Sequence, residues 1–391
     1  MSGGAFLERL LDGAEVKWTP LEKLAKIKNG KDWKHLQHGD IPVYGSGGIM
    51  GYVDTYAYDK PTVLIPRKGS ITNIFFVDTP FWNVDTIYYT EINTASILPK
   101  YLYHFIQTID MMALDTGSGR PSLTQAILNK LKIPIPCPEN PEKSLAIQAE
   151  IVRILDSFTE LTAELTAELT ARQKQYHYYR DQLLHFEEGE VEWKTLLDAC
   201  DYVDYRGKTP KKTQDGIFLV TAKNIRMGYI DYHTSQEYVS KEDYSTVMRR
   251  GYPRIGDVLI TTEAPCGFVA QVDREDIALA QRVIKYSSKD ERLSNAFLKH
   301  YLLGSQFQNK LMKSATGSTV KGIKGSKLHQ LTIPIPSRSH QARIVAILDR
   351  FDTLTQSLTE GLPREIELRQ KQYEYYRDLL FDFPKPAEVT V

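Results

Sequence analysis

The chain has 391 residues, and its 49 basic and 49 acidic side chains leave a net charge of zero at neutral pH. This length suits two or three domains, no apolar run is long enough to cross a membrane, and the first residues lack the pattern of a secretory signal. Three scattered cysteines without a C-x-x-C pair predict a reducing compartment and no disulfide framework, so we expect a cytoplasmic protein. DNA binding by such a chain would require its positive charge to be gathered on one face.

Residues 1–140 predict a first domain of mixed, mostly β structure with an N-terminal segment. Short apolar runs indicate strands, and clusters of Gly, Ser and charged residues indicate turns. In chain order we expect a strand at 16–21 that carries Trp18 as a packing anchor, a glycine-rich turn at 45–51, strands at 62–66 and 74–77 with a basic turn at 67–70 between them, a helix at 102–112, a polar turn at 116–122, a short helix, and a proline-rich linker at 133–136.

Residues 141–186 predict one long helix. Apolar residues recur at steps of three and four from Ile151 to Leu183, which places them in one stripe. About 40 residues at 1.5 Å each make a helix of roughly 60 Å, and a narrow stripe on so long a helix favours a partner helix. Two successive copies of Thr-Ala-Glu-Leu, at 162–165 and 166–169, each add one turn of stripe.

Residues 187–336 repeat the plan of the first domain. In chain order we expect a strand at 191–196 that carries Trp193, a basic loop at 205–212, a strand at 218–221, a turn and strand at 256–260, a helix at 297–312, a polar turn at 316–322 and a proline-rich linker at 333–336. The ends of the two domains match in sequence, whereas their middles barely do. This pattern is typical of one scaffold that carries two different reading surfaces.

Residues 337–391 predict a second long helix and a short tail. Q-A-R-I-V-A-I-L-D at 341–349 matches Q-A-E-I-V-R-I-L-D at 148–156. R-Q-K-Q-Y-E-Y-Y-R-D at 369–378 matches R-Q-K-Q-Y-H-Y-Y-R-D at 172–181. A duplicated unit of this length is the main organising feature of the chain, and the two helices are the obvious partners for each other.

The second helix is four residues longer between its shared ends and contains Gly361 and Pro363, which predict a break or kink. An alternative is that the two helices are ordinary core helices of one globule, but their uninterrupted length and duplication argue against it. The stripe residues that we expect to join the helices or bind a partner are Leu161, Leu165, Leu169, Tyr176, Tyr179, Leu354, Leu358, Tyr373 and Tyr376.

The sequence contains no convincing catalytic signature, and we expect no catalytic residue and no metal site. The segment 207–209, Gly-Lys-Thr, lacks the upstream glycine of a phosphate-binding loop, and G-x-G-x-x-G and the Asn- or Asp-Pro-Pro-aromatic signature of amino-methyltransferases are absent. His35 and His38 have no accompanying ligands and are expected to be exposed polar residues. Asp257 and Glu263 could indicate a nuclease, but no lysine stands at a suitable spacing.

Basic and amide-bearing turns are the remaining candidates for function. Arg, Lys and Asn read the edges of guanine and adenine and hold phosphates, and recognition residues usually lie on loops. A single such residue is as well explained by a solvated surface charge, but clustering at equivalent places in two domains favours DNA binding. The candidates are Arg67, Lys68, Ser70, Ser118, Arg120, Lys208, Lys211, Lys212, Lys223, Asn224, Arg226, Ser318, Lys321 and Lys324.

The chain resembles the DNA-specificity subunit of type I restriction–modification enzymes. The resemblance spans the whole chain and is carried by the repeated I-P-I-P segments, the matched helix starts and ends, and the T-G-S turns. The tandem T-A-E-L looks like the spacer repeat of one subfamily.

The resemblance implies an α+β fold with two mixed, mostly β target recognition domains, separated by two long helices that form an antiparallel coiled coil with a pseudo-two-fold internal repeat. It gives the boundaries 1–140, 141–186, 187–336 and 337–391 for the first domain, first helix, second domain and second helix with its tail. Each domain would read one half of a split site in double-stranded DNA, and the coiled coil would set the gap. Half-sites on one DNA face would be roughly 34 Å apart.

The family also implies partners. Two copies of a methyltransferase subunit, which carry S-adenosylmethionine and methylate adenine, would bind the two halves of the chain, and motor-nuclease subunits that use ATP and Mg would complete the complex. The chain itself would bind no cofactor and catalyse no reaction. Two alternatives stay open at this point, a coiled-coil scaffold that never touches DNA and, less favoured, an enzyme such as a nuclease.

Overall fold

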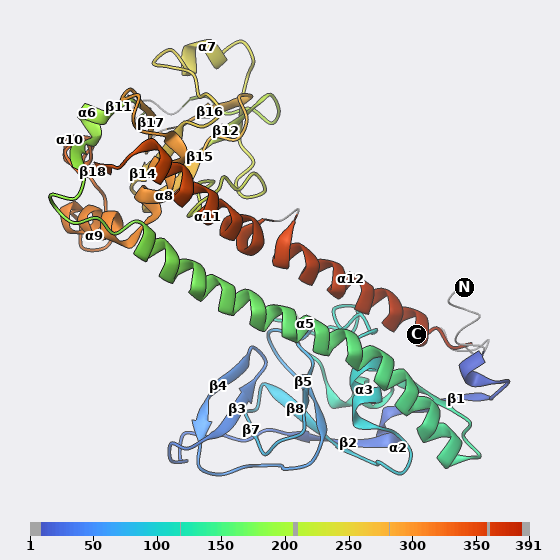
Figure 1. Ribbon diagram of the computed structural model, residues 1–391. Helices are drawn as coiled ribbons and strands as arrows, with labels where there is room; N and C mark the ends of the chain where they lie inside the picture. Colours follow the sequence, from blue (N-terminus) through green and yellow to red (C-terminus); the bar gives the residue numbers. More distant parts are fainter. Residues whose placement is uncertain (1–8, 118, 206–209, 281, 358–359, 385–391) are drawn as a thin grey trace. The chain divides into compact units, whose positions relative to one another are not determined.

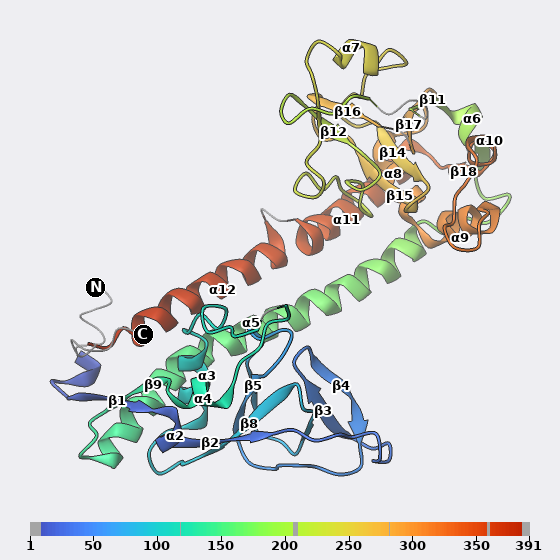
Figure 2. The same ribbon diagram turned by 180° about the vertical axis from the view of Figure 1, so that it is seen from behind.

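The computed structural model describes residues 9–117, 119–205, 210–280, 282–357 and 360–384. The chain forms two compact units, each of which is described by itself. Unit 1 contains residues 1–165 and 366–391, and unit 2 contains residues 166–365. Figures 1 and 2 show the helices and strands of each unit from two sides.

Unit 1 has three small sheets. Their strand orders are β2-β8-β5-β6, β4-β3-β7 and β1-β9, and β3 and β7 are parallel while the other pairs are antiparallel. The strands are β1 Val16–Pro20, β2 Ala25–Asn29, β3 Ile41–Gly45, β4 Gly48–Val53, β5 Thr62–Pro66, β6 Phe75–Val77, β7 Trp82–Asn83, β8 Ile87–Ile92 and β9 Lys132–Pro136. The expected strands at 62–66 and 74–77 are therefore confirmed as β5 and β6.

The globular part of unit 1 also contains the short helices α2 Leu21–Leu24, α3 Pro99–Ile106 and α4 Gln125–Asn129. The helix expected at 102–112 thus lies further toward the N-terminus. Its buried residues join a core that also contains Ile151 and Leu155 of the long helix and Tyr373 and Leu380 of the last helix. The ends of the two duplicated helices are part of the core of this unit.

Unit 2 has the same arrangement of sheets. Their strand orders are β11-β17-β14-β15, β13-β12-β16 and β10-β18. The elements are β10 Glu192–Thr195, α6 Leu196–Ala199, β11 Cys200–Asp204, β12 Ile217–Val220, β13 Tyr238–Val239, α7 Tyr244–Val247, β14 Val258–Thr262, β15 Cys266–Gln271, β16 Ile277–Leu279, β17 Val283–Ser288, α8 Asn295–Leu303, α9 Ser305–Ser314, α10 Gly325–His329 and β18 Thr332–Ile335.

The two sheet systems correspond strand for strand. In the four-stranded sheets, β2 corresponds to β11, β8 to β17, β5 to β14 and β6 to β15. In the three-stranded sheets, β4 corresponds to β13, β3 to β12 and β7 to β16. In both three-stranded sheets the central strand pairs in parallel with the last strand. The middles of the two domains, which share little sequence, therefore share one topology.

The two I-P-I-P segments are strands, so the expectation that they are linkers was wrong. β9 pairs with β1 and β18 pairs with β10, so that each proline-rich segment lies beside the strand that carries Trp18 or Trp193. Ile133 and Ile333 are buried. Proline is tolerated here because each sheet has only two strands, and an edge strand need not donate from every residue.

The helix expected at 297–312 is two helices. Gly304 separates α8 from α9, and its extended backbone (ψ 150°) cannot continue a helix. A Cβ at Gly304 would lie 3.2 Å from the Tyr301 carbonyl oxygen and 3.3 Å from Leu184. The periodicity continues across the break because both helices bury residues against the same core, as Phe297 and Phe307 do.

The long helix expected from the first duplicated segment is α5 Pro141–Leu183, and the second segment forms α11 Arg338–Gln356 and α12 Gly361–Leu380. Inside unit 1, α12 runs beside and opposite to the first part of α5, and Phe158 stacks on Tyr376 with ring centroids 5.2 Å apart. Inside unit 2, α11 runs opposite to the last part of α5, and Tyr176 stacks on Phe351 at 5.6 Å.

The predicted interruption of the second helix is confirmed at Gly361. Its φ of +77° is in the left-handed region, and a Cβ there would lie 2.4 Å from the carbonyl oxygen of Thr353. Only glycine fits this conformation and this close approach without strain. Pro363 lies in the first turn of α12, where its missing N–H has no helical partner to lose.

No helix in the described part of the chain is long and apolar enough to span a membrane. Cys137, Cys200 and Cys266 are free thiols.

Candidate nucleic-acid interface

Three segments of unit 1 meet where β5 ends. Lys68 forms a β-bridge with Ser122, and the Gly69 N–H donates to the Pro121 carbonyl at 3.0 Å. The Asn73 side-chain amide donates to the Ser46 carbonyl at 3.1 Å, which adds the turn between β3 and β4. The glycine-rich turn, the basic turn and the polar turn that the sequence indicated separately are therefore one surface.

Asp115 holds the polar turn in shape. One of its carboxylate oxygens accepts the backbone N–H groups of Gly117 and Ser122, each at 2.7 Å. These two hydrogen bonds hold the pKa of Asp115 below its usual value, and the bond from the Ser122 N–H has the larger effect. The turn needs no contribution from the side chain of Arg120, which is exposed.

The expected basic residues of unit 1 come together on this surface. Lys68, Ser70 and Arg120 are exposed and Arg67 is half-buried. None of the three cations forms an ion pair with a residue that the structure describes. They are available to a phosphate or a base edge. Ser118 lies outside the described residues.

The corresponding place in unit 2 has a different charge. The Ile323 N–H donates to the Thr262 carbonyl at 2.9 Å, as the Leu123 N–H does to the Arg67 carbonyl, and Glu263 forms a β-bridge with Gly322. Glu263 thus occupies the position that Lys68 occupies in unit 1. The expectation of basic turns at equivalent places was wrong at this point, although the polar turns at Thr116 and Thr316 do correspond.

Arg282 restores positive charge at this edge of unit 2. Its carbonyl accepts the Thr262 N–H at 2.9 Å, just as the Thr86 carbonyl accepts the Arg67 N–H at 2.8 Å. Its side chain pairs with Glu263 at 3.0 Å. Sequence reasoning missed Arg282. The sequence did contain an indication of it. Arg282 lies between two short apolar segments, which form β16 and β17, and a polar residue between two such segments predicts a turn.

A hollow of about 410 Å³ lies among the loops of unit 2. Lys212 and Glu237 form an ion pair of 2.8 Å on its lining. Lys223, also on the lining, is exposed and makes no ion pair with a described residue. Together with Arg282 these groups make the hollow a mixed-charge surface with Lys223 as its available cation.

Asn224 does not face solvent, and its expected role as a DNA contact was wrong. Its side chain is 0 % exposed. Its amide oxygen accepts from the backbone N–H and the hydroxyl of Thr221, at 3.0 and 2.8 Å, while its amide nitrogen donates to the carbonyls of Asp231, Thr234 and Ser235. Asn224 fixes the loop that comes after β12.

Arg226 has a largely structural environment as well. Its guanidinium lies 3.3 Å from the Asp231 carboxylate and 3.2 Å from the Thr234 hydroxyl. Hydrogen bonds lower the pKa of Asp231 to about 2, and the bond from the Thr234 hydroxyl is the largest cause. Arg226 remains part-exposed, so its use by a ligand would compete with this ion pair.

The other expected contacts of unit 2 are exposed side chains. Lys211, Ser318, Lys321 and Lys324 lie outside the helices and strands, and none of the three lysines forms an ion pair with a described residue. Lys321 precedes Gly322, which bridges to Glu263, so this lysine belongs to the same edge as Arg282. Lys208 lies outside the described residues.

Asp257 does have a lysine partner in space, although the sequence spacing showed none. Lys285 lies 2.6 Å from its carboxylate, and both groups are buried. The same carboxylate accepts the Arg254 N–H at 2.9 Å, so its oxygens are committed to internal contacts. Glu263 lies at the other end of β14, roughly 20 Å away at 3.3 Å per residue. These residues do not form a nuclease site.

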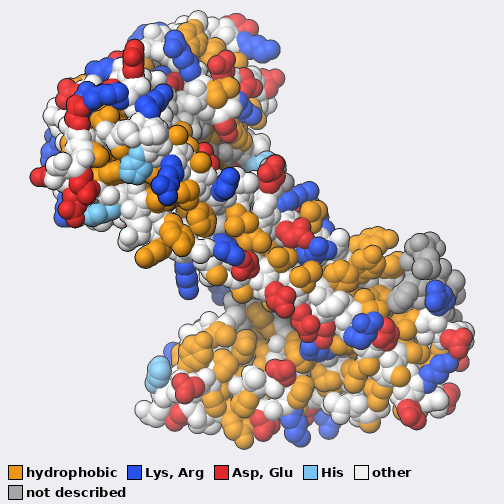
Figure 3. All heavy atoms as spheres, viewed as in Figure 1, with side chains coloured by type: hydrophobic (Ala, Val, Ile, Leu, Met, Phe, Trp, Pro, Cys, Tyr) orange, Lys and Arg blue, Asp and Glu red, His pale blue; other side chains and the backbone are white. Residues whose placement is uncertain are grey.

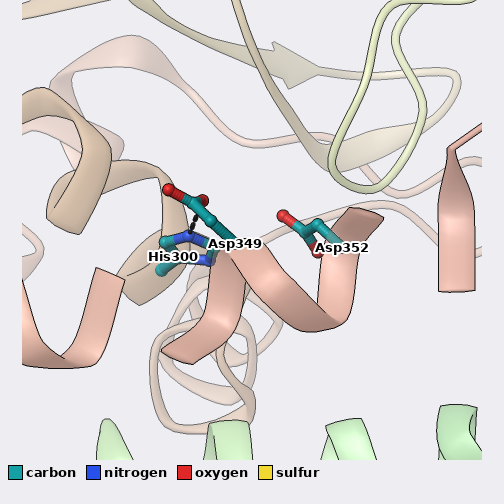
Figure 4. A group of neighbouring side chains, drawn as sticks. All are labelled: His300, Asp349 and Asp352. Atoms are coloured by element: carbon teal, nitrogen blue, oxygen red, sulfur yellow. Dashed lines mark hydrogen bonds and ion pairs between the residues drawn. The ribbon is translucent and has the colours of Figure 1, made fainter. Parts of the chain in front are cut away.

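His300, Asp349 and Asp352 form the group in the described residues whose ligand atoms are close enough to hold a metal ion (Figure 4). The ammonium group of Lys299 already lies 3.3 Å from Asp349 and 3.1 Å from Asp352. The Asp352 carboxylate also accepts the Tyr176 hydroxyl at 2.5 Å. Lys299 balances one of the two negative charges, and both carboxylates already accept contacts from the protein, so the group fits a structural junction better than a metal site.

This junction has a counterpart in unit 1. His104 Nε2 lies 3.0 Å from the Asp156 carboxylate, and His104 Nδ1 lies 2.9 Å from the Tyr373 hydroxyl. Burial is the main cause that lowers the pKa of both histidines. Each unit therefore ties a helix of its globular part to the duplicated helices by a buried histidine.

The expected stripe residues differ in their exposure. Tyr176 and Tyr373 are buried in the junctions, at 1 % and 5 % exposure. Leu161, Leu165, Leu169 and Leu354 are half-buried, whereas Tyr179 and Tyr376 are exposed. The stripe thus includes side chains that a partner could reach. Leu358 lies outside the described residues.

His35 and His38 are exposed, as expected. The edge of the His35 ring contacts Trp82, with ring centroids 6.1 Å apart. No other possible metal ligand among the described residues is grouped with either histidine.

The family model for the type I restriction modification DNA specificity domain matches the chain twice, at residues 15–172 and 189–368. The chain belongs to the type I restriction–modification specificity family. The two matches cover the two sheet systems, most of α5, all of α11 and the start of α12, so the two halves of the chain are two copies of the family's domain.

Among similar specificity subunits, that of the Escherichia coli type I restriction enzyme EcoR124I/EcoR124II is 39 % identical over 422 residues, with all of both chains covered. A putative type I specificity subunit from Haemophilus influenzae is 35 % identical and covers 97 % of this chain and 98 % of its own length. The likeness therefore extends to both reading domains and both helices.

Solved structures share the fold. The crystal structure of the type I restriction–modification S subunit from M. genitalium matches with a TM-score of 0.57 at 15 % identity, and covers 96 % of this chain and 98 % of that one. A chain from a structure that addresses complex assembly and conformational transition of the type I system matches with a TM-score of 0.58 at 16 % identity, over 94 % of this chain and 97 % of that one. The expected α+β fold of this specificity family is confirmed.

Proposed function

We propose that this chain is the DNA sequence-recognition subunit of a type I restriction–modification complex. Unit 1 and unit 2 each read one half of a bipartite, asymmetric DNA site, and the duplicated helices set the gap between the halves. The chain has no catalytic role of its own and binds no cofactor. The cytoplasm, where DNA and the partner subunits are found, is its compartment.

One observation carries this proposal. The two sheet systems have the same topology, and β5 and β14 are followed by matching turns. The side chains on those turns differ, however, with Lys68 in unit 1 and Glu263 in unit 2. Identical scaffolds would read identical half-sites if their loops were alike. Different loops on one scaffold are what two unlike half-sites require.

The duplicated helices supply the partner surfaces. Tyr179 and Tyr376 occupy equivalent positions of the repeat and are exposed by 42 % and 40 %. Two like surfaces suit two identical partners, and aromatic residues are common in protein interfaces. The partners are two methyltransferase subunits, which carry S-adenosylmethionine and methylate adenine, together with motor-nuclease subunits that use ATP and Mg.

Methylome sequencing of a host that carries the chain and its methyltransferase tests the proposal. We expect methylated adenines in a bipartite, non-palindromic sequence with a fixed gap. A continuous palindromic motif would contradict it.

The alternative is a coiled-coil scaffold that does not bind DNA. A gel shift with the methyltransferase present and absent separates the two ideas, because a recognition subunit adds sequence specificity to the complex. Complexes that bind the bipartite site and a scrambled duplex with equal affinity would favour the scaffold.

A further inference from the structure

Unit 1 has an exposed apolar ribbon beside its basic turn. β3 and β4 form a two-stranded antiparallel ribbon, joined at Ser46 and Gly47, and β4 is the edge strand of its sheet. Ile49 and Met50 next to this turn are 51 % and 57 % exposed. Figure 3 shows hydrophobic side chains gathered on this face of unit 1, around β3 and β4.

A β-bulge brings these two neighbouring side chains to the surface together. The pairing register shifts between Val43 and Tyr44, so that Met50 has no partner of its own on β3. A Cβ on Gly45 would lie 2.4 Å from the Met50 sulfur, which shows that the Met50 side chain lies across Gly45. Bulges of this kind re-aim side chains and are typical of functional edges.

The ribbon tip is fastened to the basic turn. The Ser46 N–H donates to the Thr86 hydroxyl at 3.3 Å, and the Ser46 carbonyl accepts from the Asn73 side chain at 3.1 Å. A Cβ on Gly69, next to Lys68, would lie 3.3 Å from the Ser46 hydroxyl. The apolar tip is therefore continuous with the surface that carries Arg67, Lys68 and Arg120.

The ribbon contains no charged residue. The nearest acids in sequence, Asp40 and Asp54, lie at its base, where Ile41 pairs with Val53, and not at its tip. A two-stranded ribbon fits the major groove of B-DNA, which is about 12 Å wide. Because the ribbon is neutral and cations flank its tip, phosphates on both sides of a groove would not repel it.

The side chains at the tip limit what the ribbon can read. Gly45, Ser46, Gly47 and Gly48 provide no bidentate donor for guanine or adenine, and Ile49 and Met50 are apolar. Apolar side chains distinguish base pairs in the major groove by contact with the 5-methyl group of thymine. We infer that the β3–β4 ribbon enters the major groove and that Ile49 and Met50 recognise thymine methyl groups in the half-site read by unit 1; this inference rests on the proposed function.

Unit 2 has a different element at this position. The Val84 N–H donates to the Tyr44 carbonyl, and the Ala280 N–H donates to the Val220 carbonyl, both at 3.0 Å, so the residues after Tyr44 and Val220 correspond. In unit 2 a long loop with the exposed Lys223 replaces the ribbon turn. Unit 1 thus reads with apolar contacts where unit 2 presents a cation.

The test uses the assembled complex and the bipartite site found by methylome sequencing. Each thymine is replaced in turn by deoxyuridine, which lacks the methyl group and pairs in the same way, and affinity is measured at fixed salt. We expect about fourfold weaker binding for each contacted methyl group, in one half-site only. The double variant Ile49→Ser/Met50→Ser should bind thymine and deoxyuridine duplexes equally at those positions.

A matched control is Ile255→Ser. Ile255 is 63 % exposed and precedes β14 at the opposite end of that strand from Glu263. This variant should keep the full response to deoxyuridine. The comparison separates the loss of a specific methyl contact from a general effect of removing an exposed isoleucine.

Several outcomes would overturn the inference. One is that no replacement of thymine by deoxyuridine, in either half-site, changes the affinity of the wild type more than that of the double variant. If specific binding persists in that case, the proposed function stands and only this inference fails. Another is a double variant that fails to assemble with the methyltransferase, which would make the ribbon a protein-docking edge. Failure to find any bipartite site would overturn the proposed function and this inference with it.

Discussion

His300 Nε2 lies 2.8 Å from the Oδ1 atom of Asp349, and this contact joins α8 of unit 2 to α11. His300 is fully buried, whereas the Asp349 side chain is half exposed. The hydrogen bond from His300 is the main cause of the lowered pKa of Asp349. The duplicated helix is therefore attached to the globular part of unit 2 by a polar contact as well as by the apolar residues Ile344 and Leu348.

Replacing Asp349 should weaken this attachment. Asp349→Ala leaves the Nε2 atom of buried His300 without its partner, and we expect a loss of roughly 1–3 kcal/mol in the free energy of unfolding. Urea unfolding measures the effect, and amide hydrogen exchange should be fastest to change in α8 and α11. The control is Glu291→Ala, at an exposed carboxylate of the same unit. Equal stability of the two variants would contradict the structural role of the pair.

Two adjacent residues of unit 2 should respond in opposite ways. Asn224→Ala removes the side chain that holds the loop after β12 and should lower the free energy of unfolding by about 2–3 kcal/mol, because several backbone groups lose their partner. Lys223→Ala should leave stability unchanged, since Lys223 is exposed, and should weaken DNA binding. Unfolding curves and binding at fixed salt test both. A stable Asn224→Ala variant with normal loop exchange would show that the loop is held by other interactions.

The three basic residues on the surface of unit 1 should contribute to the salt dependence of DNA binding. If Arg67→Ala, Lys68→Ala or Arg120→Ala removes one contact to a phosphate, the slope of log K against log salt should become shallower by about 0.9. Affinity should then fall for specific and scrambled duplexes alike. Lys132→Ala, an exposed lysine at the start of β9, is the control. An unchanged slope for all three variants would place the DNA elsewhere.

The sequence was sufficient for features that depend on local pattern. The 3.6-residue stripe of α5 and the break at Gly361 depend on neighbouring residues and were predicted correctly. Other features depend on residues far apart in the chain. The I-P-I-P segments become strands because β1 and β10 lie more than a hundred residues upstream, and no local rule supplies that partner.

The candidate site shows the same division. Arg67, Lys68 and Arg120 were found as basic turns, since exposed turn residues have a clear composition. Asn224 was misjudged because its burial depends on carbonyls of Asp231 and Thr234 that only the folded loop brings near. Arg282 was missed because its place beside Glu263 depends on the pairing of β14 with β17.

The loop that Asp231 organises should weaken in acid. Hydrogen bonds from Thr234, His233 and Arg226 lower the pKa of Asp231 to about 2, against an ordinary value of 3.8. A lowered carboxyl pKa gives stability that is fully present above about pH 4 and is lost as the pH falls toward 2. Asp231→Asn removes the titrating group, so wild-type protein should lose more protection of the loop amides over this interval than the variant. Parallel losses in both proteins would show that other carboxylates dominate.

Lengthening α5 should change the spacing of the DNA site without changing its sequence. The two Thr-Ala-Glu-Leu copies end at Leu165 and Leu169, and the division between unit 1 and unit 2 falls between these two leucines. A third copy after Leu169 adds about 6 Å to the helix and rotates its C-terminal part by roughly 40° beyond a full turn, while the leucine of the new copy continues the apolar stripe. We expect a longer gap between unchanged half-sites in the methylome of a host that carries the variant. An insertion of the same length into the exposed turn at Gly189, outside the helix, should leave the gap as it was. Half-sites that change in sequence when the helix is lengthened would show that α5 does not act as the spacer.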